Sequence, residues 1–161
     1  MYEDYFEKIK KQQLDELEEI IDNKIFKAGL NILYIDGPED DPDLIIPARK
    51  VMIINRNSNS EQPVVYRKGH ELHHYLEADP LSIAVYEYSP LCKRQEERSA
   101  NEGAVKTFAA ILYSDLPNEA RDWTKMIDLF NLPNWYDQIV VDAVYDNPID
   151  LLNYDKEDYF D

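Results

Sequence analysis

The chain has 161 residues, of which 44% are hydrophobic, and its formal net charge is −16. This length favours one ordinary domain with a real core over two domains, and the hydrophobic content excludes a disordered chain. An acidic field repels phosphate backbones, so we expect no direct contact with nucleic acid.

The sequence also bears on the compartment. Its N-terminus lacks the basic segment and apolar core of a secretory signal, and no apolar run approaches the roughly 18 residues of a membrane span. The single cysteine, Cys92, excludes an intramolecular disulfide. We therefore expect a cytoplasmic protein with no membrane partner. Cys92 is typical of a small buried hydrophobe, and the alternative is a metal ligand or a nucleophile.

In chain order, residues 3–28 carry apolar side chains near helical spacing, and Gly29 is well placed to end this helix. An acidic, proline-rich loop follows at 37–43. Pro47 indicates a strand edge or an interruption of the sheet. Short apolar stretches predict three strands, at residues 31–36, 44–46 and 51–54.

The rest of the chain is predicted to be helical. Pro63 suits the first turn of a helix, and Pro117 and Pro133 mark breaks between later helices. The predicted helices cover residues 63–77, 92–114, 119–130 and 134–145. The order of a helix, a few strands and then helices predicts an α+β fold for a single domain, 1–145. Residues 146–161 form an acidic C-terminal extension, either docked or frayed.

The strongest chemical signal is the segment His70-Glu71-Leu72-His73-His74, which contains all three histidines. On a helix, residues four apart share a face with Cβ atoms about 6 Å apart, so His70 and His74 can bind one zinc ion. Glu71 lies beside that face, where it can act as the general base. His73 lies off the ligand face, as a surface residue or a neighbour of the site.

A catalytic zinc site needs a third protein ligand and an open position. The following predicted helix offers Glu96, Glu97 and Glu102, and Cys92 is a weaker alternative. Helical phase places Glu97 on the inward stripe with Asn101, Ala104, Phe108, Ile111 and Leu112. A carboxylate on an apolar face is costly to bury unless it is paired or metal-bound, so Glu97 is the best candidate. The alternative for Glu97 is a salt bridge to Arg94 or Arg98.

These motifs resemble the ImmA/IrrE family of metallo-endopeptidases, of the phage and prophage type. The resemblance covers roughly residues 15–145, through H-E-L-x-H at His70–His74 and E-x-x-A-N at Glu97, Ala100 and Asn101. Residues 122–133 are similar to the helical C-terminal region of phage members. The chain departs from the family pattern at His73, where a small residue is usual, and at Gly103, where a phenylalanine is usual.

The resemblance implies a mainly helical, zincin-like fold whose active-site helix carries HExxH. It also implies zinc held by His70, His74 and Glu97, with Glu71 as the base. Family members cleave or otherwise inactivate helix-turn-helix transcriptional repressors, so the expected function is an endopeptidase that acts as an antirepressor. One alternative is a non-proteolytic, metal-stabilised module that displaces a repressor from DNA. Another is a peptidase with an unrelated substrate, such as a toxin or a host factor.

Overall fold

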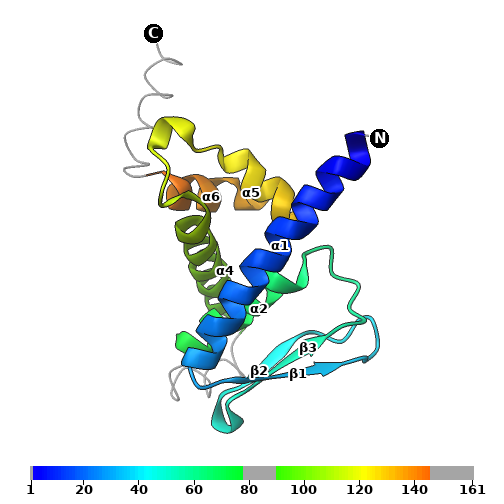
Figure 1. The fold of residues 1–161 in the computed structure, drawn as a ribbon. Coiled ribbons are helices and arrows are strands. Elements are labelled where there is room, and N and C mark those ends of the chain that lie inside the picture. Colours follow the sequence, from blue (N-terminus) through cyan, green and yellow to red (C-terminus); the bar gives the residue numbers. More distant parts are fainter. Residues whose placement is uncertain (1, 78–89, 146–161) are drawn as a thin grey trace. The chain divides into compact units, whose positions relative to one another are not determined.

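The computed structural model describes residues 2–77 and 90–145, with side chains given from residue 94 onward in the second range. The described chain is mostly helical with a small mixed sheet, so the predicted α+β class is confirmed (Figure 1). By its contacts the chain divides into two compact units, Met1–Ala104 and Val105–Asp161. The predicted acidic extension, 146–161, lies outside the described residues.

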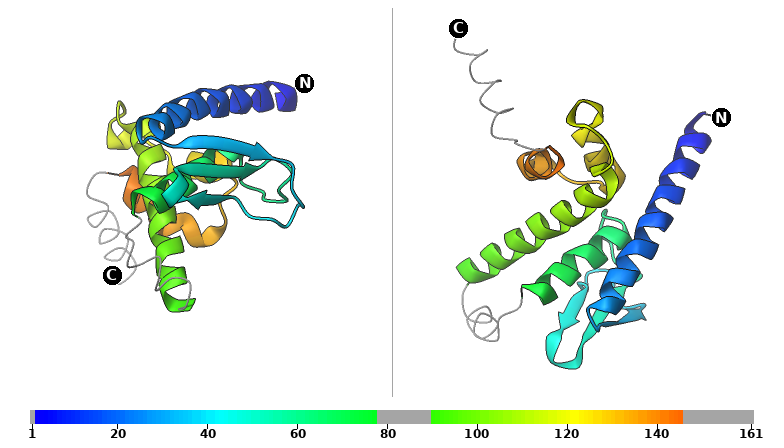
Figure 2. Two further views of the ribbon diagram at one scale, coloured as in Figure 1. Left: turned by 90° about the horizontal axis from the view of Figure 1, so that it is seen from below. Right: turned by 60° about the vertical axis from the view of Figure 1, so that its left-hand side comes forward.

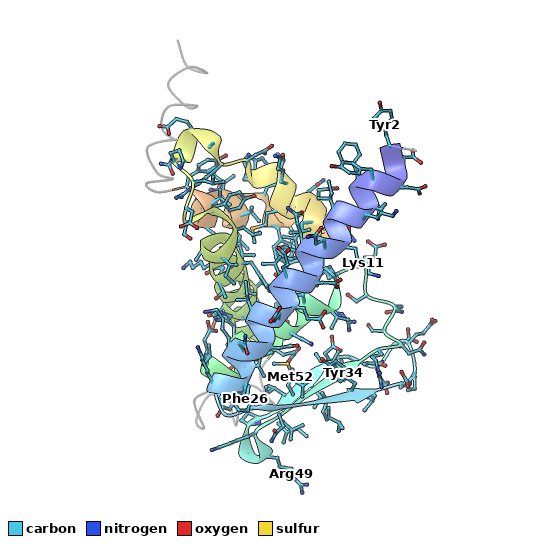
Figure 3. The ribbon with its side chains drawn as sticks, in the orientation of Figure 1. Tyr2, Lys11, Phe26, Tyr34, Arg49 and Met52 are labelled. Atoms are coloured by element: carbon cyan, nitrogen blue, oxygen red, sulfur yellow. The ribbon has the colours of Figure 1, made fainter. Side chains whose placement is uncertain are left out.

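The first unit begins with helix α1, Tyr2–Lys27. Its buried side chains are Leu17, Ile21 and Ile25, spaced four residues apart along one face of the helix. The helix therefore packs through its second half, whereas Tyr2 and most of its first half are exposed (Figure 3). Gly29 follows with a φ of 84°, a left-handed conformation that glycine adopts without strain and that lets the chain turn into the sheet.

Three strands form the sheet in the order β1-β3-β2. They are β1 (Asn31–Ile35), β2 (Leu44–Ile46) and β3 (Val51–Asn55), and β3 pairs parallel with β1 and antiparallel with β2. Met52 and Ile54 of the central strand are fully buried, on the side of the sheet where α1 and α2 lie (Figures 2 and 3). Pro47 starts a 3-10 turn directly after β2, which is an edge strand, as the proline predicts.

Helix α2 (Val64–Leu76) packs against α1, β2 and β3. Pro63 precedes the helix in an extended conformation instead of occupying its first turn. Two consecutive cationic residues of α2, Arg67 and Lys68, are buried. Lys68 donates to Glu18 and Asp22 of α1, both at 2.8 Å, and its ammonium group lies 5.0 Å from the Tyr34 ring centroid. These charges tie α2 to α1 and to the sheet.

Asn55, at the end of β3, organises the acidic loop. Its side chain is fully buried, donates to the carbonyl oxygens of Pro38 and Asp41, and accepts from the backbone N–H of Gly37 and of Asn57. The side-chain amide of Asn55 therefore hydrogen-bonds only to backbone groups. Such groups need hydrogen-bond partners when they are buried. These hydrogen bonds tie the loop that carries Asp43 to the end of β3.

Helix α4 (Pro90–Tyr113) runs from the first unit into the second, which also contains α5 (Trp123–Phe130) and α6 (Asp137–Val144). In this second unit Phe108 packs against Phe130 with ring centroids 4.8 Å apart. The α5 and α6 helices are shorter than predicted, because 3-10 turns after Pro117 and Pro133 occupy the start of each predicted stretch. In the part of the chain that the structure describes, no helix has the length and hydropathy needed to cross a bilayer.

We predict that Lys68→Met reduces the free energy of unfolding by about 1.5–3 kcal/mol, the range for losing hydrogen bonds to charged groups. The change keeps the length of the stem but leaves Glu18 and Asp22 facing each other without a cation. Lys11→Met, on the exposed part of α1, is the matched control. Urea denaturation of both variants measures the difference, and equal stabilities would contradict a structural role for the buried ion pairs.

Candidate metal centre

Helix α2 brings His70 and His74 onto one face, one turn apart, as the spacing predicts. Their Nε2 atoms are 3.0 Å from each other, and the two rings are nearly perpendicular at 86°. Both side chains are largely buried. The buried side of α2 packs against the sheet and α1, and these contacts fix the helix that carries the two imidazoles.

Glu97 of α4 completes the cluster. One carboxylate oxygen lies 3.1 Å from Nε2 of His70, and the other lies 3.0 Å from Nε2 of His74. Asn101 and Ala104, which follow Glu97 at helical spacing, are buried, so this face of α4 points inward as the helical phase predicts. The structure therefore brings the three predicted ligands together within one unit of the chain.

The donor set fits a metal ion. Candidate ligand atoms of His70, Glu71 and His74 all lie within 4.8 Å of one another, and Glu97 adds contacts to both imidazoles. The two Nε2 atoms can share a hydrogen bond with each other or donate to Glu97, and a metal ion bound between them would take the place of these protons. A divalent metal satisfies both imidazole lone pairs and the carboxylate at once.

Glu71 lies on the same helix but is oriented differently. Only 9% of the residue is exposed, and burial raises the pKa of its carboxyl group to about 7. The charges of Asp43 and Glu97 raise this pKa further, whereas those of His70 and His74 lower it. A carboxyl group with a pKa near neutrality is suited to exchange protons at physiological pH.

Glu97 and His74 are shifted in opposite directions by their contact. Hydrogen bonds from His70 and His74 hold the pKa of Glu97 well below its usual range. Burial lowers the pKa of His74, but the hydrogen bond to Glu97 and the charges of Glu71, Glu97 and Glu96 raise it overall above its ordinary value. Glu97 is thus held as an anion, the form that binds a metal.

The other candidates do not join the ligand cluster. Glu102 pairs with Arg98 at 3.1 Å, and Glu96 is half-buried and acts on His74 only through its charge. The alternative pairing of Glu97 with Arg98 is therefore not what the structure shows. Cys92 lies within α4, but its side chain is outside the described residues.

His73 is half-buried, and burial lowers its pKa. Its ring lies against Gly103 of α4, at a distance that leaves no room for a Cβ atom there. His73 and Gly103 therefore contact each other across the two helices. The sequence placed His73 off the ligand face but gave no signal that it would contact Gly103.

The sequence analysis did not predict the ion pair between Asp43 and Arg67, which lies next to the site. Asp43, one of several acids in its loop, accepts two hydrogen bonds from Arg67 at 2.7 and 2.9 Å and one from the backbone N–H of Asn55 at 2.7 Å. Arg67 precedes Glu71 by one turn, so this ion pair fixes α2 next to the candidate base. Asp43 is distinguished from the neighbouring acids of its loop by its ion pair with the buried Arg67. This pairing depends on the tertiary fold.

No protein-family model, curated protein or solved structure matches this chain. The function proposed below is therefore supported by the motifs of the sequence and by the geometry of the described residues.

We predict that Glu97→Gln weakens metal binding by at least about 10–100-fold, the cost typical of losing even a neighbour of a metal ligand. The amide keeps the shape of the side chain but removes the charge. Glu102→Gln and Glu96→Gln are the controls and should change affinity little. Competition with a chelator measures all three, and a larger loss with Glu96→Gln would place the ligand one residue earlier on α4.

Proposed function

We propose that this chain is a zinc-dependent endopeptidase of the ImmA/IrrE type, with zinc held by His70, His74 and Glu97 and with Glu71 as general base. The observation that carries the proposal is the convergence of two imidazoles and one carboxylate beside a second, buried carboxylate. Two histidines and one glutamate with an open fourth position are a known ligand set of catalytic zinc sites.

The separations of the ligand atoms support zinc. Ligands bound at about 2.0–2.1 Å in a tetrahedral arrangement are separated from one another by roughly 3.3 Å. The two imidazole Nε2 atoms are 3.0 Å apart, and each lies 3.0–3.1 Å from a different oxygen of the Glu97 carboxylate. Small outward movements of these side chains would therefore admit the ion without rebuilding the helices. A mixed set of imidazole nitrogen and carboxylate oxygen donors also suits zinc better than it suits calcium or magnesium, which prefer oxygen ligands alone.

Zinc, when bound, supplies Lewis acidity, which acidifies water and polarises a peptide carbonyl group. The chain supplies the proton transfer. The carboxylate of Glu71 would accept a proton from the attacking water and pass it to the nitrogen of the leaving amine. Burial raises the pKa of this carboxyl group to about 7. The charge of Asp43, whose carboxylate is paired with Arg67, also raises the pKa of Glu71.

The proposed substrate is a helix-turn-helix repressor, and the resulting activity is that of an antirepressor. Support for this substrate comes from the resemblance of the HELxH and ExxAN motifs. The formal charge of −16 is compatible with it, since an acidic protein is attracted to a basic DNA-binding partner. We propose that this cleavage takes place in the cytoplasm, where the repressor acts.

Purified protein should contain about one zinc ion per chain. His70→Ala or His74→Ala should abolish the bound metal, because each removes one of the two nitrogen donors. Elemental analysis after removal of loosely bound metal provides the measurement. Near-full zinc content in either variant would show that the HExxH segment is not the site.

Glu71→Gln should keep zinc and the fold but lower the rate of peptide cleavage by about 10²–10⁴-fold, the contribution typical of a general base. The amide cannot accept a proton from water. Each protein is mixed with its candidate repressor, the repressor is followed by mass spectrometry, and a reporter gene measures derepression. The proposal requires fragments with the wild type and few or none with Glu71→Gln.

The same experiment distinguishes the displacement model. If Glu71→Gln relieves repression fully and the repressor remains intact, binding alone is sufficient and the endopeptidase proposal fails. If fragments appear only with the wild type while derepression is lost with Glu71→Gln, cleavage causes the switch.

A further inference from the structure

Outside the ligand cluster, His73 of α2 and Gly103 of α4 lie in close contact. An ideal Cβ atom built on Gly103 would lie 2.7 Å from Cγ and 2.9 Å from Cε1 of the His73 ring, and closer still to Nδ1. Carbon atoms that are not bonded pack at about 3.5–4.0 Å. The ring of His73 therefore occupies the space that any other residue at position 103 would need.

We infer that His73 and Gly103 are a positioning pair that sets the approach of α4 to α2 and thereby carries the Glu97 carboxylate to the two imidazoles. This inference rests on the proposed metal site. It assigns a role to a histidine that is not a ligand and to a glycine inside a helix.

The geometry of two contacts supports this role. Glu97 meets His70 and His74, and Gly103 meets His73 six residues later, about 9 Å further along α4 at 1.5 Å per residue. A single point of contact would let α4 pivot about it. Two contacts separated along α4 restrict this pivoting and so constrain the approach of this part of α4 to α2.

The composition of α4 supports the same conclusion. Glycine in a helix interior is unfavourable relative to alanine, because it loses more backbone freedom on folding. Gly103 lies well inside Pro90–Tyr113, with Ala100 and Ala104 buried on either side. A close approach by the His73 ring, whose side chain is only 16% exposed, gives a physical reason for this otherwise costly residue.

Small displacements matter here because metal ligands must lie within about 0.2 Å of their bonding positions. A Cβ atom at position 103 would clash with the His73 ring. To relieve the clash, either the ring must turn or the two helices must separate by several tenths of an ångström or more. The first moves the residue next to His74, and the second moves Glu97. Both changes disturb the ligands without altering any of them.

The test is a double-mutant cycle on the full chain, with zinc affinity measured by chelator competition and the unfolding midpoint of the metal-free protein measured in parallel. Gly103→Ala should weaken zinc binding at least about 10-fold. His73→Ala should have a smaller effect. The double variant His73→Ala/Gly103→Ala should regain the affinity of His73→Ala, because the truncated side chain makes room for the new Cβ.

Ser99→Ala, at an exposed position of the same helix, is the control, and it should leave zinc affinity unchanged. Should Gly103→Ala fail to fold, recovery of folding and zinc binding in the double variant still supports the inference, and failure of both overturns it. Wild-type affinity in Gly103→Ala, or losses that simply add in the double variant, also overturns it. Absence of zinc binding by the wild type would instead refute the proposed function.

Discussion

The described first unit depends on the burial of two adjacent cations in α2. Arg67 and Lys68 point to different sides of the helix, where Asp43 compensates one and Glu18 and Asp22 compensate the other. Burying an unpaired charge costs several kcal/mol even after relaxation, so any other rotation of α2 is strongly disfavoured. Fixing this rotation also fixes the direction in which the imidazoles two and six residues beyond Lys68 project.

The site itself is a balance of charges confined to a small volume. Two carboxylates, Glu71 and Glu97, lie beside two imidazoles, and a third, Asp43, acts on Glu71 from the loop. Contact with the imidazoles keeps Glu97 ionised, whereas burial makes Glu71 hold its proton more tightly. Chemically similar side chains thus differ in protonation because their surroundings differ, and a bound cation would add positive charge beside Glu71 and Glu97.

Support for the site comes from segments that are distant in sequence. The loop of residues 37–43 is folded around Asn55, which places Asp43 against Arg67, while α1 supplies the partners of Lys68. Gly103 and His73 join α4 to the same helix. None of these residues belongs to the candidate ligand set, yet together they constrain where its donor atoms lie. This dependence is expected where ligands must be held to within tenths of an ångström.

Sequence alone determined the helical spacing of His70 and His74, the strands and the inward phase of Glu97, since local periodicity controls these features. It also indicated the α+β class. Where each helix begins was less well determined: Pro63 lies before its helix, and 3-10 turns replace the first turns predicted after Pro117 and Pro133. Only the tertiary structure selected Asp43 among the loop acids and placed His73 against Gly103, because such contacts join segments whose separation in sequence carries no periodic signal.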